Sequence, residues 1–245
     1  MYWKLAPYPL PDMSPFVSRS FHVVTPDENL HIYGIHYDAS HYHHGLFDRY
    51  GITAPNFLNQ AVAKRNSEYL AGRLVARQAM ASGSHCEMHQ MPQITTGQHR
   101  EPRWPQHLLG AITHSDNIAL AVVAAKARFR FIGIDYEEIL CEKTATSIAS
   151  QIVDEEEKAI LTASSIPFEH ALTLAFSAKE SVYKAIFGEV QQVLSFQDAK
   201  IVHLEEGRLT LQLGNAVIKR LRDKTCLFVY FTFKFNGVIT LVASD

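Results

Sequence analysis

Apolar residues recur at helical spacing in three stretches of the chain. Residues 57–82 form the clearest of them, and this stretch ends at Ser82-Gly83, because a glycine commonly follows the last turn of a helix. Its apolar stripe consists of Leu58, Val62, Leu70 and Leu74. Residues 144–163 and 169–187 have the same periodicity. The pattern therefore predicts three helices.

Alternating and continuous apolar runs predict strands elsewhere in the chain. Residues 108–113 and 118–124 flank the polar sequence His114-Ser115-Asp116-Asn117, which is typical of a hairpin turn. Residues 129–135 alternate between apolar and other residues and predict a further strand. Residues 199–243 are rich in Val, Ile, Phe and Thr, which favours several antiparallel strands.

The first 56 residues show no sustained period. Five of the ten prolines lie within the first 26 residues, and six of the thirteen histidines lie within the first 50. We expect an irregular extension here, with one short strand around residues 31–35. His41, His43 and His44 form a tract that either binds a metal ion or is an exposed polar loop, and the loop is the more common case.

Composition and charge narrow the class of protein. The chain has 245 residues, of which 47% are hydrophobic and 20% charged, so a globular protein of one or two domains is expected. The formal net charge of -2 gives no sign of nucleic-acid binding. The apolar run 118–125 is too short to span a bilayer, and the start of the chain lacks the apolar core of a signal peptide. Three cysteines without a CxxC pair fit a cytoplasmic protein.

One candidate site follows the strand predicted at residues 129–135. Residues at i and i+2 of an extended chain point to the same face, so Asp135 and Glu137 would carry two carboxylates about 7 Å apart on one side of the strand. Such a pair suits Mg²⁺, which binds one or two carboxylates together with phosphate and water. Two exposed acidic residues are the more common explanation of an Asp-x-Glu sequence.

A second candidate lies in the predicted helix at residues 169–187. Glu180 and Lys184 are four residues apart, which predicts either a surface ion pair or a carboxylate one turn from a cation that faces a phosphate. Ser177 and Glu180 also fit a helix-capping box. The spacing alone does not decide between these interpretations.

Two further groups could contact a phosphate. The first predicted helix has a basic face, which is either solvated or a guanidinium site for a phosphorylated ligand. That face consists of Lys64, Arg65, Arg73 and Arg77. His114, at the predicted hairpin turn, either packs locally or donates to a phosphate oxygen.

In their order and spacing these segments resemble the 4′-phosphopantetheinyl transferases, in the larger type built of two halves and in its siderophore branch. The likeness runs from about residue 60 to residue 205. The longest matching segment is 171–185, ALTLAFSAKESVYKA. The other matching segments are 100–105 (REPRWP), 110–115 (GAITHS) and 133–137 (GIDYE).

The resemblance implies an α+β fold that is a pseudo-dimer of two similar α/β halves, with coenzyme A in the cleft between them. The halves would be residues 1–128, including the irregular Pro/His-rich extension, and residues 129–245, which carry the metal and catalytic motifs. The implied reaction is Mg²⁺-dependent and moves the 4′-phosphopantetheine group from coenzyme A to a serine of an apo carrier protein, releasing 3′,5′-ADP. The partners would be carrier domains of a nonribosomal peptide synthetase that makes an enterobactin-like siderophore, and the enzyme would act as a monomer.

The resemblance also assigns roles to residues. Mg²⁺ would be bound by Asp135, the Tyr136 carbonyl, Glu137 and Glu180. Glu180 would be the base for the carrier serine, and Lys184 would stabilise the leaving group, with Asp135 completing the catalytic set. Lys179 would support the same charge more loosely. The residues that contact coenzyme A would be Arg65, Arg73, Thr96, Gly97, Gln98, His99, Thr113, His114, Asp135, Glu180 and Lys184.

Two departures from the family pattern bear on these assignments. Thr96 and His99 stand where some members have lysines, so backbone N–H groups, Arg100 or a charged His99 would have to replace them. Tyr136 is bulkier than the usual residue between the two acids. Two alternatives to the transferase are a catalytically silent scaffold that binds coenzyme A and another Mg²⁺-dependent nucleotide enzyme. The presence of all the acids and of Lys184 disfavours the scaffold, and the lack of a P-loop disfavours the nucleotide enzyme.

Overall fold

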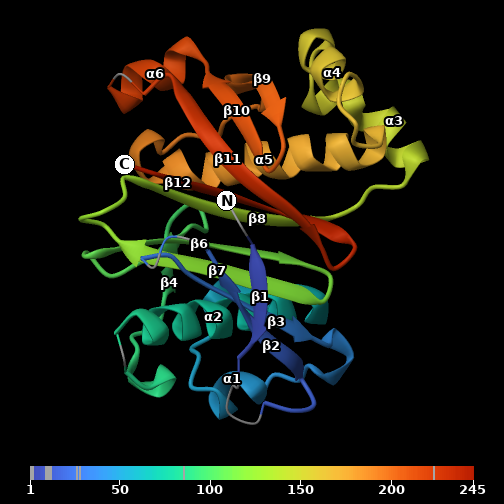
Figure 1. Cartoon of the computed structure of the whole chain (residues 1–245). Helices are drawn as coiled ribbons and strands as arrows, with labels where there is room; N and C mark the ends of the chain where they lie inside the picture. Colours follow the sequence, from blue (N-terminus) through green and yellow to red (C-terminus); the bar gives the residue numbers. More distant parts are fainter. Residues whose placement is uncertain (1–2, 9–12, 26, 28, 85, 223) are drawn as a thin grey trace. The chain divides into compact units, whose positions relative to one another are not determined.

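In the computed structural model, each half of the chain pairs a five-stranded antiparallel sheet with one long helix (Figure 1). The structure describes residues 3–8, 13–25, 27, 29–84, 86–222 and 224–245. The chain divides into two units, residues 1–128 and 129–245. Among the described helices, none has both the length and the apolar character that crossing a bilayer requires.

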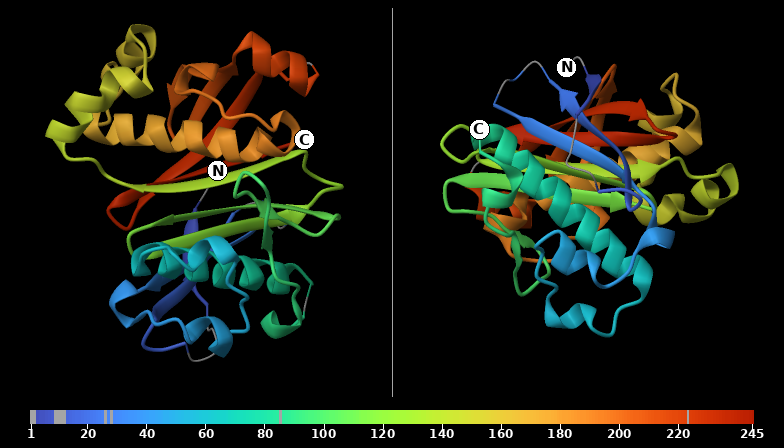
Figure 2. Two further views of the ribbon diagram at one scale, coloured as in Figure 1. Left: turned by 180° about the vertical axis from the view of Figure 1, so that it is seen from behind. Right: turned by 90° about the horizontal axis from the view of Figure 1, so that it is seen from below.

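The first unit has the sheet order β1-β2-β3-β7-β6, and α2 (Ala63–Ser84) lies across one face of it (Figures 1 and 2). The strands are β1 (Lys4–Pro7), β2 (Val17–Val24), β3 (His31–Tyr37), β6 (Leu108–Ser115) and β7 (Ile118–Ala125). Smaller elements are α1 (Leu46–Arg49), the 3₁₀ turns η1 (Ala39–His41), η2 (Asn56–Leu58) and η3 (Met88–Gln90), and the ribbon of β4 (Thr95–Thr96) with β5 (Pro102–Arg103).

The N-terminal segment is more ordered than its composition indicated. The strand expected around residues 31–35 is confirmed as β3. The expectation that the rest of the extension is irregular was wrong for two stretches, because β1 and β2 are also strands of the first sheet. In β2, Phe21 and Val23 are buried while Val24 is exposed, so the alternation exists but is short. Pro7 and Pro15 lie at or outside strand ends, where proline is tolerated. Residues 1–2, 9–12, 26 and 28 of this segment lie outside the described residues.

The first long helix begins later than the apolar stripe predicted. Residue 63, not 57, is its first residue, because Leu58 belongs to the separate turn η2. Val62, which also appeared to be part of the stripe, is 71% exposed. Leu70 and Leu74 are buried against the sheet as expected.

The second unit has the sheet order β8-β12-β11-β10-β9, with α5 (Phe168–Val190) along one face and α3 and α4 at one end of α5 (Figure 2). The strands are β8 (Phe131–Glu138), β9 (Ala199–Glu205), β10 (Arg208–Leu213), β11 (Cys226–Lys234) and β12 (Gly237–Ser244). The remaining elements are α3 (Glu142–Ile152), α4 (Glu155–Thr162), α6 (Asn215–Leu221) and the 3₁₀ turn η4 (Phe196–Asp198).

Two helical predictions for this unit need correction. The helix expected at 144–163 is divided, because Asp154 and Glu157 form a capping box that starts a new helix. The region 199–243 contains α6 as well as strands, since Val217 and Leu221, four residues apart, bury one face of a short helix. The capping box that Ser177 and Glu180 also fitted in the sequence is absent, because both residues lie in the interior of α5.

The two units share one arrangement of elements. In each, a strand is followed by the long helix and then by a hairpin whose last strand pairs with the first strand: β3, α2, β6 and β7 in one, β8, α5, β11 and β12 in the other. The units differ in where extra strands are added, beyond β3 in the first and beyond β11 in the second. The α+β fold with two similar halves is therefore confirmed.

Candidate active site

A small cavity in the first unit gathers several of the predicted coenzyme A residues. It has a volume of about 110 Å³, and its wall is formed by α2, the β4–β5 ribbon and β6. Four expected residues line it, namely Arg65, Arg73, Thr96 and His114. The other lining residues are Phe57, Glu68, Tyr69, Gly72, Arg100, Pro102 and Ile112.

Arg73 is the best-defined cation of this cavity. Its side chain is buried, its guanidinium lies 4.4 Å above the Tyr69 ring, and one Nη donates to Thr96 Oγ1 over 3.0 Å. Burial lowers the pKa of Arg73, and its Nε has no hydrogen-bond partner among the described residues. No carboxylate in the described part of the chain forms an ion pair with it. A buried cation without an anion is costly, so this arrangement suits an anionic ligand.

Arg65 and His114 share an acidic neighbour. The Arg65 Nη1 lies 3.3 Å from both Glu68 Oε2 and His114 Nε2, and His114 Nδ1 lies 3.9 Å from the same carboxylate. The remaining basic residues of α2 do not line the cavity. Arg77 donates to the carbonyls of residues 50 and 51, and Lys64 pairs with Asp116.

The loop after β4 is held by Glu101. The Glu101 carboxylate accepts from the N–H of His99 and occupies the space that a Cβ at position 97 would fill, so a side chain at position 97 would displace it. Thr96 and Gly97 line a second cavity of about 460 Å³. Gln98 and His99 line neither cavity, and Arg100 lies 5.6 Å from the Phe57 ring in the first.

Thr113 and His114 lie within β6, which extends two residues beyond the predicted strand end. The Thr113 side chain is buried, and of the two residues His114 alone lines the 110 Å³ cavity. The turn of the hairpin is therefore formed by Asp116 and Asn117.

In the second unit, Asp135 on β8 is met by two side chains from α5. Lys184 Nζ lies 2.6 Å from Asp135 Oδ1, and Ser177 Oγ donates to Asp135 Oδ2 over 2.7 Å. The contact brings together side chains of β8 and α5 that the resemblance assigned to one site, and Lys184 pairs with Asp135 and not with Glu180. Asp135 is buried, so its two oxygens have fixed environments.

Glu137 and Glu180 lie near enough to Asp135 for its charge to disfavour ionisation of both. Burial, followed by the charge of Asp135, raises the pKa of Glu137 to about 7, although Lys184 opposes the shift. Burial also raises the pKa of Glu180, and Asp135 adds to this effect. Both shifts follow from placing carboxylates close together where water is scarce.

The arrangement differs from a formed metal site. No three His, Cys, Asp or Glu side chains in the described ranges are placed so that together they could hold a metal ion. The Tyr136 side chain points away from Asp135, is fully buried, and donates its hydroxyl to the Phe235 carbonyl over 2.8 Å. Tyr136 could therefore offer a ligand only through its backbone.

Comparison with known proteins identifies the family. Residues 54–124 match the 4′-phosphopantetheinyl transferase N-terminal domain, and residues 131–234 match the 4′-phosphopantetheinyl transferase superfamily. Enterobactin synthase component D from Salmonella typhi is 37% identical over 230 residues, which cover 94% of this chain and 88% of that protein. The protein of the same name from Escherichia coli (strain K12) is 35% identical, covering 77% and 82%. The transferase Npt of Nocardia iowensis is 32% identical, covering 62% and 66%.

The chain belongs to the 4′-phosphopantetheinyl transferase superfamily. It is an enzyme that transfers the phosphopantetheine group of coenzyme A to a carrier protein. The family resemblance recognised in the sequence is confirmed.

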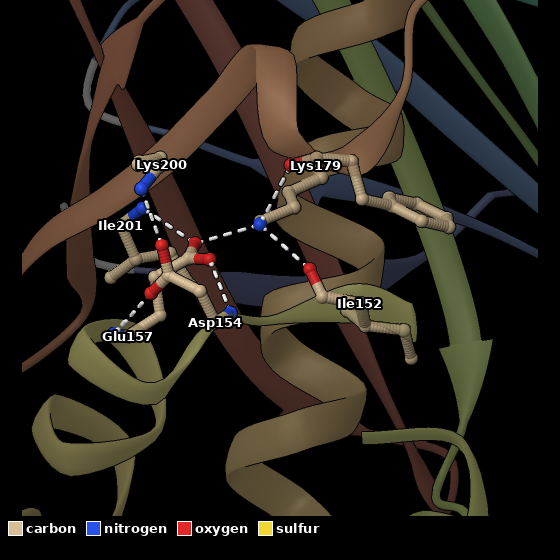
Figure 3. Close-up of polar contacts among 7 residues, drawn as sticks. Ile152, Asp154, Glu157, Lys179, Lys200 and Ile201 are labelled. Carbon is tan, nitrogen blue, oxygen red and sulfur yellow. Dashed lines mark hydrogen bonds and ion pairs between the residues drawn. The ribbon is translucent and has the colours of Figure 1, made fainter. Parts of the chain in front are cut away.

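Lys179 has a structural role in this transferase, which corrects the expectation that it supports the phosphate charge (Figure 3). Its Nζ lies 2.7 Å from Glu157 Oε1 and donates to the carbonyls of Ile152 and Phe196, each over 2.8 Å. Glu157 also accepts from the N–H of Ile201. Lys179 and Glu157 are both buried, so the pair joins α5 to α4 and β9 and faces away from the Asp135 centre.

Several residues around these centres escaped the sequence analysis. Tyr69 lies four residues before Arg73 on the basic face of α2, and that spacing could have indicated it. Thr240 interrupts the apolar run of β12, and a hydroxyl in such a run needs a buried partner. Glu68 and Phe57 carried no comparable signal.

We predict that Lys179→Met destabilises the transferase by about 3–5 kcal/mol, because it leaves the buried Glu157 carboxylate without its cation. The double variant Lys179→Met/Glu157→Gln should recover part of the lost unfolding free energy, because it no longer buries an unpaired carboxylate. Lys200→Met, which removes only the exposed pair with Asp154, should cost less than about 1 kcal/mol. Urea unfolding measures all three variants, and equal losses for Lys179→Met and Lys200→Met would contradict the assignment.

We predict that the metal-free transferase loses stability as the pH rises through about 7. The pKa of Glu137 in the folded state exceeds its ordinary value, so stability that depends on the neutral carboxyl is present at low pH and lost as the group ionises. In EDTA, Glu137→Gln should reduce the difference in melting temperature between pH 5.5 and pH 8.5. Glu206→Gln, an exposed residue of the second unit whose charge is not among those that shift the pKa of Glu137, should keep the wild-type difference. An unchanged pH dependence in Glu137→Gln would refute the prediction.

Proposed function

We propose that this transferase activates carrier domains of a nonribosomal peptide synthetase that makes an enterobactin-like siderophore. The pantetheine-bearing phosphoryl group passes to a carrier serine, and 3′,5′-ADP is released. Support comes from the relatives named enterobactin synthase component D, which align along most of the chain. We place the reaction in the cytoplasm, in keeping with three widely spaced cysteines.

The observation that carries this proposal is the buried, anion-deficient guanidinium of Arg73. Together with Arg65, His114 and Thr96 it would bind the 3′-phosphate end of coenzyme A. The adjoining cavity of about 460 Å³ gives room beside this phosphate, and Thr96 lines both cavities. Arg100, which also lines the smaller cavity, is the cation best placed to replace the lysines that some relatives have in this loop.

The acidic centre of the second unit suits Mg²⁺. Its carboxylates are hard oxygen ligands, and burial together with the charge of Asp135 raises the pKa of Glu137, so a divalent cation would stabilise the ionised carboxylates. Asp135, Glu137 and Glu180 would hold the ion, with the Tyr136 carbonyl as a further candidate ligand. When bound, Mg²⁺ would offset negative charge on the pyrophosphate of coenzyme A.

Glu180 is the base in this proposal. A carboxylate whose pKa is raised towards neutrality is a better proton acceptor, and Glu180 would take the proton of the carrier serine directly or through a water. The serine oxygen then bonds to the phosphorus that carries the pantetheine arm while the bond from that phosphorus to 3′,5′-ADP breaks. Lys184, one helical turn from Glu180, would balance the charge on the leaving phosphate.

The proposal predicts that the protein with coenzyme A and Mg²⁺ adds one phosphopantetheine group to an apo aryl carrier domain, as seen by intact-mass spectrometry. Glu180→Gln should slow this reaction by about 100-fold or more, because general base catalysis is lost. EDTA should also stop it. Glu169→Gln, on the same helix but in its first turn, should react at the wild-type rate.

Two results would contradict these assignments separately. A wild-type protein that binds coenzyme A but modifies no carrier domain would favour the silent scaffold. If the Glu180→Gln variant reacts at the wild-type rate, the transferase function stands, but Glu180 is not the base.

A further inference from the structure

Three hydroxyl side chains lie buried between α5 and the sheet of the second unit. Ser177 and Ser181 are on α5, one turn apart, and Thr240 is on β12. Each has an exposed fraction of 0%. Burying a hydroxyl without a partner is costly, so the partners of these groups explain why an otherwise apolar interface contains them.

The three hydroxyls form a chain that ends on Asp135. Ser177 Oγ donates to Asp135 Oδ2 over 2.7 Å. Thr240 Oγ1 lies 2.9 Å from Ser177 Oγ, and Ser181 Oγ lies 2.6 Å from Thr240 Oγ1. Asp135 and Thr240 are also directly paired in the sheet, so the chain spans β8, β12 and α5.

The protons of this chain have one consistent direction. Each hydroxyl has a single proton, and an ionised carboxylate can only accept. Because Ser177 gives its proton to Asp135, Thr240 donates towards Ser177, whose carbonyl lies 3.0 Å from Thr240 Oγ1. Ser181 then donates towards Thr240, to its hydroxyl or to its carbonyl, which is 3.1 Å away. The chain therefore fixes the Asp135 carboxyl group from its Oδ2 side and leaves Oδ1 to face Lys184.

The backbone around this chain leaves little freedom. A Cβ at position 133 on β8 would overlap the Ser181 carbonyl oxygen and lie 2.8 Å from the Ala185 nitrogen. Helix α5 thus lies directly on β8. The hydrogen bonds of Ser177 and Ser181 with Thr240 determine which face of α5 is turned towards the sheet. Glu180 and Lys184 belong to the same turns of α5.

We infer that Ser177 and Thr240 are positioning residues of the transferase, which hold Asp135 in the orientation that its reaction requires. They touch neither substrate nor metal in this account and act through Asp135. The inference rests on the proposed function in assigning Asp135 to the Mg²⁺ site. Groups that orient a metal ligand commonly change metal affinity or activity by about 10- to 100-fold when they are removed.

The test compares hydroxyl-deleting and hydroxyl-retaining variants. Ser177→Ala and Thr240→Val should raise the Mg²⁺ concentration that half-saturates carrier loading by about 10-fold, with a smaller change in the KM for the carrier. Thr240→Ser keeps the hydroxyl and should stay within about 2-fold of wild type. Mn²⁺ binding in the presence of coenzyme A, followed by electron paramagnetic resonance without turnover, should weaken in the same two variants.

Thr173→Val is the matched control. Thr173 is buried on the same helix, but its hydroxyl donates to the Glu169 carbonyl and accepts from the Leu140 N–H, away from Asp135. It should lower the unfolding midpoint without changing Mg²⁺ half-saturation.

If Ser177→Ala and Thr240→Val lose stability but keep wild-type Mg²⁺ half-saturation and Mn²⁺ affinity, the hydroxyls only satisfy the core and the inference fails. Should Ser177→Ala not fold, the pair Thr240→Val and Thr240→Ser decides the question. A wild-type protein that binds Mn²⁺ with coenzyme A but loads no carrier would instead refute the proposed function. In that case the Mn²⁺ affinities of Ser177→Ala and Thr240→Val would still test whether the hydroxyls position Asp135.

Discussion

Helix α5 lies on strand β8 at a separation set by Gly133, where no Cβ fits beneath the Ser181 carbonyl. Everything in the acidic centre depends on this contact. It brings Lys184 and Ser177 onto the two oxygens of Asp135, and it places Glu180 beside the same carboxylate. The buried pair of Lys179 and Glu157 joins the same helix to α4 and β9, so the register of α5 is held at more than one point.

The two units contain buried charge of opposite sign that their own side chains do not fully neutralise. In the first, Arg73 is a buried cation without an ion-pair partner among the described residues. In the second, Lys184 pairs with Asp135, and burial together with the charge of Asp135 raises the pKa of Glu137 to about 7. A phosphorylated ligand would satisfy the first unit, and a divalent cation the second. Coenzyme A with Mg²⁺ supplies both, which is why the proposed reaction accounts for charges that would otherwise destabilise each unit.

The sequence predicted the family better than the course of the chain. The segments 100–105, 110–115, 133–137 and 171–185, taken together in their order and spacing, indicated the family, which the comparisons confirm. Strands β1 and β2 were missed because their alternation is short and interrupted by prolines. The structural role of Lys179 could not be predicted either, because its partners Glu157, Ile152 and Phe196 come from elements whose packing no local pattern encodes. For the same reason Ser177 resembled a helix cap until its contact with Asp135 was visible.

The central claim is that the close contact of α5 with β8 builds the acidic centre, and Gly133→Ala tests it most directly. The added methyl group must push α5 away from β8, so we expect carrier loading to fall by about 10-fold or more and the unfolding free energy to drop by about 1–3 kcal/mol. Gly188→Ala, on the same helix with nothing within 4 Å of the new Cβ, should be neutral or slightly stabilising. A Gly133→Ala enzyme with wild-type stability and wild-type carrier loading would contradict the account.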